Sequence, residues 1–101
     1  MTWLKILDYG DFYDVPRCIV VERDGALYAF DCPFDEDIDD YRASYEVFRL
    51  PDSARDIATQ RSVPWDEVLR LGERVGTVAV STIRFDTTKR NSLHQDAFEG
   101  L

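Results

Sequence analysis

The sequence contains few of the residues on which nucleophilic catalysis and zinc binding depend. It has 1 histidine and 2 cysteines among 101 residues, and His94 lies far along the chain from Cys18 and Cys32. A Cys–His nucleophile pair and a zinc site both need such residues clustered together. No glycine-rich phosphate-binding loop and no G-x-S-x-G serine motif occurs either. We therefore expect a non-enzymatic protein that uses no cofactor.

Long apolar runs are also missing from the sequence. No run approaches the roughly 18 residues that a helix needs to span a bilayer. The apolar stretch at Trp3–Leu7 is too short for a signal peptide. Two cysteines do not make a disulfide framework. These absences predict a cytoplasmic protein with two reduced thiols and no membrane contact.

Basic residues are scarce in the first half of the chain. Residues 1–52 hold 13 acids and 5 bases, whereas residues 53–101 hold 7 of each, so the net charge of −8 comes entirely from the first half. The segment Asp31–Asp40 contains six acids and no base. Nucleic acids and anionic membranes bind cationic surfaces, so we expect neither as a direct partner.

The clearest local pattern is a β-hairpin. Two β-prone runs, 17–23 and 26–32, flank Asp24-Gly25, which is typical of a two-residue type I′ turn. In such a hairpin Arg23 faces Ala26 and Cys18 faces Asp31. The two cysteines then lie on opposite faces, and both faces carry apolar residues, so we expect the hairpin to be central and covered on both sides.

Three further β-prone runs and two helical segments complete the expected fold. The predicted strands are 3–7, 17–23, 26–32, 45–50 and 74–85, and the predicted helices are 64–72 and, shorter, 51–58. The fold class is mainly β, a β-rich α+β fold. We expect a five-stranded, mostly antiparallel curled sheet or small partly open barrel, with one or two short helices between the last two strands. Residues 1–90 form a single globular domain, and residues 91–101 a frayed or short helical tail. The predicted core is Ile6, Ile19, Val21, Tyr28, Phe30, Val47, Val68, Leu69, Val78, Val80 and Ile83.

Two loops interleave acids with aromatic residues, a combination that suits protein interfaces. The first spans residues 8–14 and the second residues 33–44. The candidate binding residues are Asp11, Phe12, Tyr13, Asp14, Phe34, Asp35, Asp37, Asp39, Asp40 and Tyr41. We expect these residues to dock a basic protein surface, as an inhibitor, an immunity protein or a regulatory interaction domain would.

Three other interpretations stay open from the sequence. Asp35, Asp37, Asp39 and Glu46 follow the ligand spacing of a calcium-binding loop, although Asp40 stands where that loop needs glycine and strands stand where it needs helices. Asp31 is a candidate acid for a small carboxylate-based hydrolase, unless Arg17 neutralises Asp31 or Asp35. The acids also serve solubility and protect exposed strand edges, and those edges allow a homodimer.

Overall fold

The computed structural model describes residues 3–10, 17–60, 63–82, 92–94 and 98, and everything below concerns these residues. The main sheet has the strand order β7-β6-β3-β2-β1-β8, and every neighbouring pair is antiparallel. The edges β7 and β8 do not pair with each other in the described residues, so the sheet is open. The strands are β1 (Trp3–Gly10), β2 (Cys18–Arg23), β3 (Ala26–Asp31), β6 (Ser44–Leu50), β7 (Glu73–Ala79) and β8 (Ser92–His94).

Five of these six strands are those expected from the sequence, and the central hairpin has the predicted register. Cys18 pairs with Asp31 and Arg23 pairs with Ala26. The turn residues Asp24 and Gly25 have φ values of 52° and 80°. A type I′ turn requires positive φ at both central positions, which explains why Asp-Gly specifies this hairpin. Both cysteines are free thiols, as expected.

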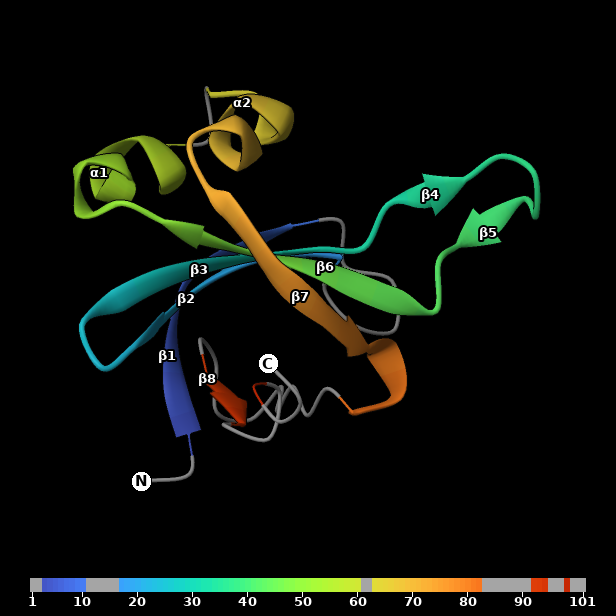
Figure 1. Cartoon of the computed structure of the whole chain (residues 1–101), viewed down its shortest axis with the longest axis horizontal. Helices are drawn as coiled ribbons and strands as arrows, with labels where there is room; N and C mark the ends of the chain where they lie inside the picture. Colours follow the sequence, from blue (N-terminus) through green and yellow to red (C-terminus); the bar gives the residue numbers. More distant parts are fainter. Residues whose placement is uncertain (1–2, 11–16, 61–62, 83–91, 95–97, 99–101) are drawn as a thin grey trace.

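The helical part lies between β6 and β7 along the chain, and it covers one face of the sheet (Figure 1). It comprises η1 (Asp52–Ala54), α1 (Arg55–Ala58) and α2 (Trp65–Arg70). Helix α2 follows Pro64, which serves as its N-cap residue, and has acids in its first turn and Arg70 in its last, so its ends agree with the sequence signals. None of the described helices is long and apolar enough to traverse a lipid bilayer.

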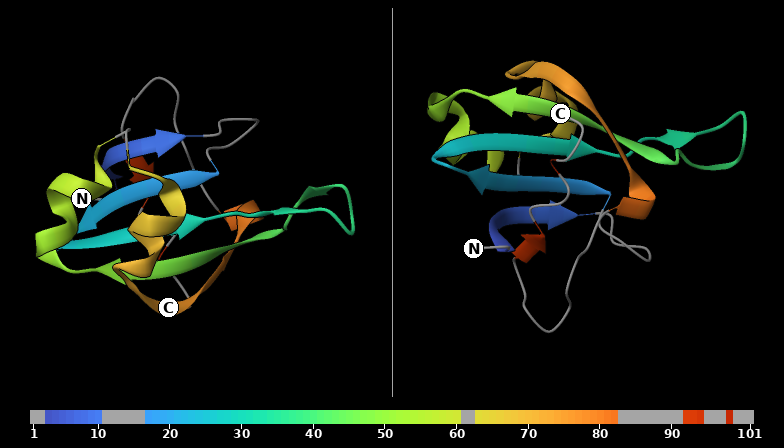
Figure 2. Two further views of the ribbon diagram at one scale, coloured as in Figure 1. Left: turned by 90° about the horizontal axis from the view of Figure 1, so that it is seen from above. Right: turned by 60° about the horizontal axis from the view of Figure 1, so that its bottom comes forward.

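Each face of the sheet has its own hydrophobic core. The helix-covered core contains Val20, Leu27, Ala29, Leu50, Ala54, Ala58 and Val68. The core on the opposite face contains Ile6, Ile19, Val21, Phe30, Cys32, Tyr45, Val47, Val78, Leu93 and Phe98. The views of Figure 2 show the helices on one side of the strands only. Seven predicted core residues are buried, whereas Tyr28, Leu69 and Val80 are partly buried and Ile83 lies outside the described residues.

Two expectations about the second half of the chain need correction. The predicted strand 74–85 ends at Ala79, because the backbone turns into the 3₁₀ helix η2 (Val80–Thr82). Ser92–His94, expected in a frayed or short helical tail, instead forms β8 and pairs with β1. Leu93 is fully buried there and Phe98 is 5% exposed, because the face of the sheet opposite the helices needs apolar cover.

Candidate functional site

The acidic segment between β3 and β6 forms a small separate hairpin, called here the acidic hairpin (residues 33–42). Its strands are β4 (Phe34–Asp35) and β5 (Asp40–Tyr41). Phe34 pairs with Tyr41, and the amide of Arg42 donates to the carbonyl of Pro33 at 3.0 Å. Figure 1 shows this hairpin projecting beyond the main sheet. The acids are therefore displayed on a structured protrusion and not on a loop lying across the body.

The turn of the acidic hairpin is stabilised by its own acidic residues. The amide of Asp37 donates to Asp35 Oδ1 at 3.0 Å, an Asx-type bond that a short carboxylate side chain makes readily. Asp39 has φ of 51°, in the left-handed region that Asp adopts more easily than most residues. Some of the acids thus have a structural role in the turn as well as a charge.

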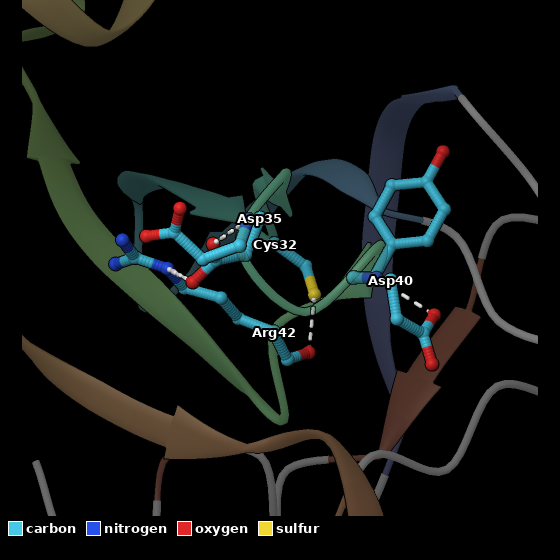
Figure 3. A network of polar contacts seen from close by, with 6 residues as sticks. Cys32, Asp35, Asp40 and Arg42 are labelled. Atoms are coloured by element: carbon cyan, nitrogen blue, oxygen red, sulfur yellow. Dashed lines mark hydrogen bonds and ion pairs between the residues drawn. The ribbon is translucent and has the colours of Figure 1, made fainter.

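The root of the acidic hairpin is fastened to the main sheet by buried polar contacts. The Arg17 guanidinium lies 4.5 Å from the centroid of the Tyr41 ring, and its Nη1 donates to Cys32 Sγ at 3.4 Å. The Cys32 thiol donates in turn to the carbonyl oxygen of Arg42 at 3.1 Å, a contact drawn in Figure 3. Cation–π contact with a desolvated guanidinium is among the stronger interactions of this kind. The root is therefore held in one orientation.

Most of the hairpin's carboxylates face water without a cation beside them. Asp35 is the exception, since its Oδ2 lies 3.5 Å from Nε of Arg42. In the part of the chain that the structure describes, no ion pair involves the exposed residues Glu36, Asp37, Asp39 or Asp40. The cation beside Asp35 is thus Arg42. The prediction that Arg17 neutralises the Asp35 carboxylate is wrong.

Exposed apolar side chains accompany these charges. Phe34 is 51% exposed and Ile38 is 61% exposed. The rings of Phe34 and Tyr41 meet edge to face, with their centroids 5.4 Å apart. Large side chains that stay exposed on an ordered element are typical of contact surfaces.

The calcium-like spacing does not correspond to a preformed metal site. Across residues 3–10, 17–60, 63–82, 92–94 and 98, no cluster of three or more His, Cys, Asp or Glu side chains could hold a metal ion. Glu46 lies in β6, where its Oε1 is 3.6 Å from Nε of Arg74. As the sequence indicated, strands stand where a calcium-binding loop needs helices, and the four acids form no such cluster in the described residues.

Asp31 at the end of β3 is a half-buried carboxyl, as the sequence suggested. Burial raises its pKa above the ordinary value of 3.8, and the nearby charge of Glu46 raises it further. A hydrogen bond from the Trp65 indole, with Nε1 2.9 Å from Asp31 Oδ1, and the charge of Arg42 act in the opposite direction. The sequence placed Asp31 correctly at the strand end but gave no signal for Trp65, which is 34 residues away.

A pocket of about 340 Å³ lies beside this pair, between the strand ends of β1 and β2 and the α1–α2 segment. Its described lining includes Asp8, Cys18, Gln60 and Trp65. None of these residues was a candidate binding residue in the sequence, because only the packing of α2 against the sheet creates the pocket. Hydrophobic periodicity in 64–72 predicted the helix but not the place where it docks.

The candidates of the first loop, Asp11, Phe12, Tyr13 and Asp14, lie outside the described residues. The remaining candidates, from Phe34 to Tyr41, all belong to the acidic hairpin. Ile38, 61% exposed, also belongs to the acidic hairpin, and the sequence pattern does not indicate it because a single apolar residue among acids has no periodicity. No protein-family model, no curated protein and no solved structure matches this chain.

Proposed function

We propose that this chain is a small binding module that docks a basic protein surface through the acidic hairpin. The observation that carries the proposal is the exposure of four carboxylates without ion pairs, beside exposed Phe34 and Ile38, on one ordered protrusion. Like charges held close together destabilise the free protein. A cationic partner relieves this repulsion on binding.

The charge pattern favours fast and selective association. Complementary potentials steer encounter and raise association rates by about 10- to 1000-fold at low ionic strength. An acidic surface also rejects acidic competitors. The net charge of −8 comes from residues 1–52, and the acidic hairpin is the most acidic part of that half.

The rigid root supports affinity in addition to rate. A surface that is already ordered loses less conformational entropy on binding. The contacts of Arg17 with Tyr41 and Cys32 keep the acidic hairpin in one orientation before the partner arrives. Phe34 and Ile38 then supply apolar area that is removed from water when the complex forms.

A charge-reversal experiment tests the proposal. The natural partner is captured from native extract at low salt, purified, and its association with the chain is followed by surface plasmon resonance. The test variant carries Glu36→Lys, Asp37→Lys and Asp40→Lys, and Asp39 is left unchanged because of its positive φ. We expect the association rate to fall at least about tenfold at low salt, and its salt dependence to flatten or invert.

A matched control carries the same charge change elsewhere. Asp52→Lys, Asp56→Lys and Glu73→Lys replace exposed acids on η1, α1 and β7. Both triple variants have the same net charge, so a general charge effect slows both equally. Equal slowing, or no slowing of the hairpin variant, would refute a specific role for the acidic hairpin.

A further inference from the structure

Arginine side chains balance the acids at the strand ends beside the pocket described above. Asp31 pairs with Glu46 across β3 and β6, and Glu46 Oε1 lies 3.6 Å from Nε of Arg74. The charge of Arg42 acts on Asp31. Asp8, in the pocket lining, is engaged in an interaction of its own. These contacts leave the pocket without a strong charge of either sign, so its shape and its lining decide what it can bind.

The pocket reaches the helix-covered core. Val20, Ala58 and Val68 line it and are only 1%, 4% and 2% exposed, and all three belong to that core. Val63 and Pro64, in the segment that joins α1 to α2, add further apolar lining. An apolar group placed here would leave water and contact core side chains, which is favourable.

The composition of this core explains why space remains there. The side chains buried in the helix-covered core are aliphatic, and three of the seven are alanine: Val20, Leu27, Ala29, Leu50, Ala54, Ala58 and Val68. The core on the opposite face contains the larger Phe30, Tyr45 and Phe98. Small side chains fill less of the space between a helix and a sheet, and a poorly filled space leaves dispersion contacts unmade. A ligand that occupies the pocket restores such contacts.

Trp65 gives the pocket an aromatic wall with a fixed orientation. Its indole Nε1 lies 2.9 Å from Asp31 Oδ1, and this hydrogen bond holds the ring in place while the residue lines the pocket. Aromatic rings attract one another in edge-to-face and offset arrangements beyond what the burial of their area contributes. The wall therefore favours an aromatic ligand over an aliphatic one of the same size.

Volume and charge narrow the class of ligand further. A cavity of about 150 Å³ with an aliphatic lining is large enough for benzene, and this pocket has about 340 Å³, which gives room for a molecule of one or two rings. The described lining residues include no lysine or arginine, so an anion would lose its hydration without a counter-charge. A cation would find the Asp8 carboxylate already engaged.

We propose that this pocket binds a small neutral molecule with an aromatic ring, packed against Trp65 and the core residues Val20 and Val68. Gln60, also in the lining, carries an amide that suits a single polar group on such a molecule. None of the described lining residues belongs to the acidic hairpin. The inference therefore goes beyond the proposed function and needs no basic partner.

Nuclear magnetic resonance tests the site with benzyl alcohol as the probe. Benzyl alcohol is titrated into the ¹⁵N-labelled chain, and the indole Nε1–H peak of Trp65 is followed, assigned by its loss in Trp65→Phe. We expect a saturable shift with a Kd on the order of millimolar, because a ligand of so few atoms makes few contacts. A shift that grows linearly with concentration, or no shift, would overturn the proposal.

Three relatives of the probe test the class of ligand. Benzoate and benzylammonium are the charged counterparts of benzyl alcohol, and cyclohexylmethanol is its aliphatic counterpart. Each is added to the complex, and its Kd is obtained from the reversal of the Trp65 shift. We expect the two charged compounds to bind at least about tenfold more weakly, and cyclohexylmethanol several-fold more weakly. Equal or tighter binding of any of the three would refute the class of ligand assigned here.

Variants that fill the pocket locate the site. Ala58→Leu adds bulk at a lining position, and Ala43→Leu makes the same change at an exposed position outside the lining. Ala58→Leu should abolish the saturable shift, because its side chain takes the place of the ligand, and Ala43→Leu should leave the Kd unchanged. An unchanged Kd in Ala58→Leu, or an equal loss of binding in both variants, would contradict this location.

A second matched pair covers the case in which the buried leucine prevents folding, which the dispersion of the amide spectrum reveals. Val63→Phe narrows the pocket from the segment between α1 and α2, and Val75→Phe, at a 45% exposed position of β7, is its control. Val63→Phe should weaken the binding of benzyl alcohol at least about tenfold, and Val75→Phe should not. Equal binding by the two variants would refute the site, whatever the outcome for the acidic hairpin.

Discussion

Phe98 offers a sharp test of whether the C-terminal residues belong to the core. Its ring meets Tyr28 edge to face with centroids 4.9 Å apart and Phe30 with centroids 5.4 Å apart. The guanidinium of Arg23 lies 4.7 Å from the centroid of the same ring. The residue is 5% exposed. Replacing it with alanine therefore removes a buried aromatic ring together with three specific contacts.

The expected magnitude follows from burial and packing. A buried Phe→Ala substitution destabilises by about 3–5 kcal/mol, which includes the cavity that it leaves. For a domain of this size each kcal/mol lowers the melting temperature by roughly 4–8 °C. Phe98→Ala should thus lower the melting temperature by at least about 12 °C. The loss is a large share of the roughly 5–15 kcal/mol that holds a domain folded.

Phe34→Ala is the matched control, because the chemical change is identical and the surroundings differ. Phe34 is 51% exposed, and among the described residues its ring meets that of Tyr41 edge to face. We expect it to lower the free energy of unfolding by about 1 kcal/mol or less. Urea unfolding followed by circular dichroism measures both variants, with the midpoint shifting and the slope unchanged. Equal losses in the two variants would refute the inclusion of Phe98 in the core.

Two further predictions concern single positions. Burial raises the pKa of Asp31 above 3.8, so over a range of pH above this value the folded state keeps a proton that the unfolded state has lost. The contribution of this carboxyl to the free energy of unfolding therefore falls as pH rises through that range. Asp31→Asn keeps an acceptor for the Trp65 indole but cannot titrate. The free energy of unfolding of this variant, measured in urea, should therefore rise relative to that of the wild type between about pH 3 and pH 7. A difference that does not change with pH would contradict the raised pKa of Asp31. Gly72→Ala would place a Cβ 2.8 Å from Leu50 Cδ2 and 3.0 Å from the Arg49 carbonyl oxygen. This crowding should destabilise by about 1–3 kcal/mol, and an unchanged thermal midpoint would show that the neighbours yield freely.

The sequence by itself determined the features that depend on near neighbours in the chain. Asp24-Gly25 specified the turn and therefore the register of the central hairpin, since positive φ is required at both positions. Pro64 and the acids that follow it indicated where α2 begins. Alternating apolar residues on both faces predicted that the hairpin would be covered on both sides, which it is.

Only the tertiary structure decided which distant residues meet. The bond from Trp65 to Asp31 and the pairing of Ser92–His94 with β1 join segments far apart in sequence, and no local preference encodes either. The charge of the acidic segment is evident from the sequence alone. Its folding into a hairpin that is held by Arg17 and Cys32 depends on packing against the sheet. Turns and helix ends are decided by steric limits and hydrogen bonds within a few residues, whereas pockets and strand edges depend on which apolar faces remain to be covered.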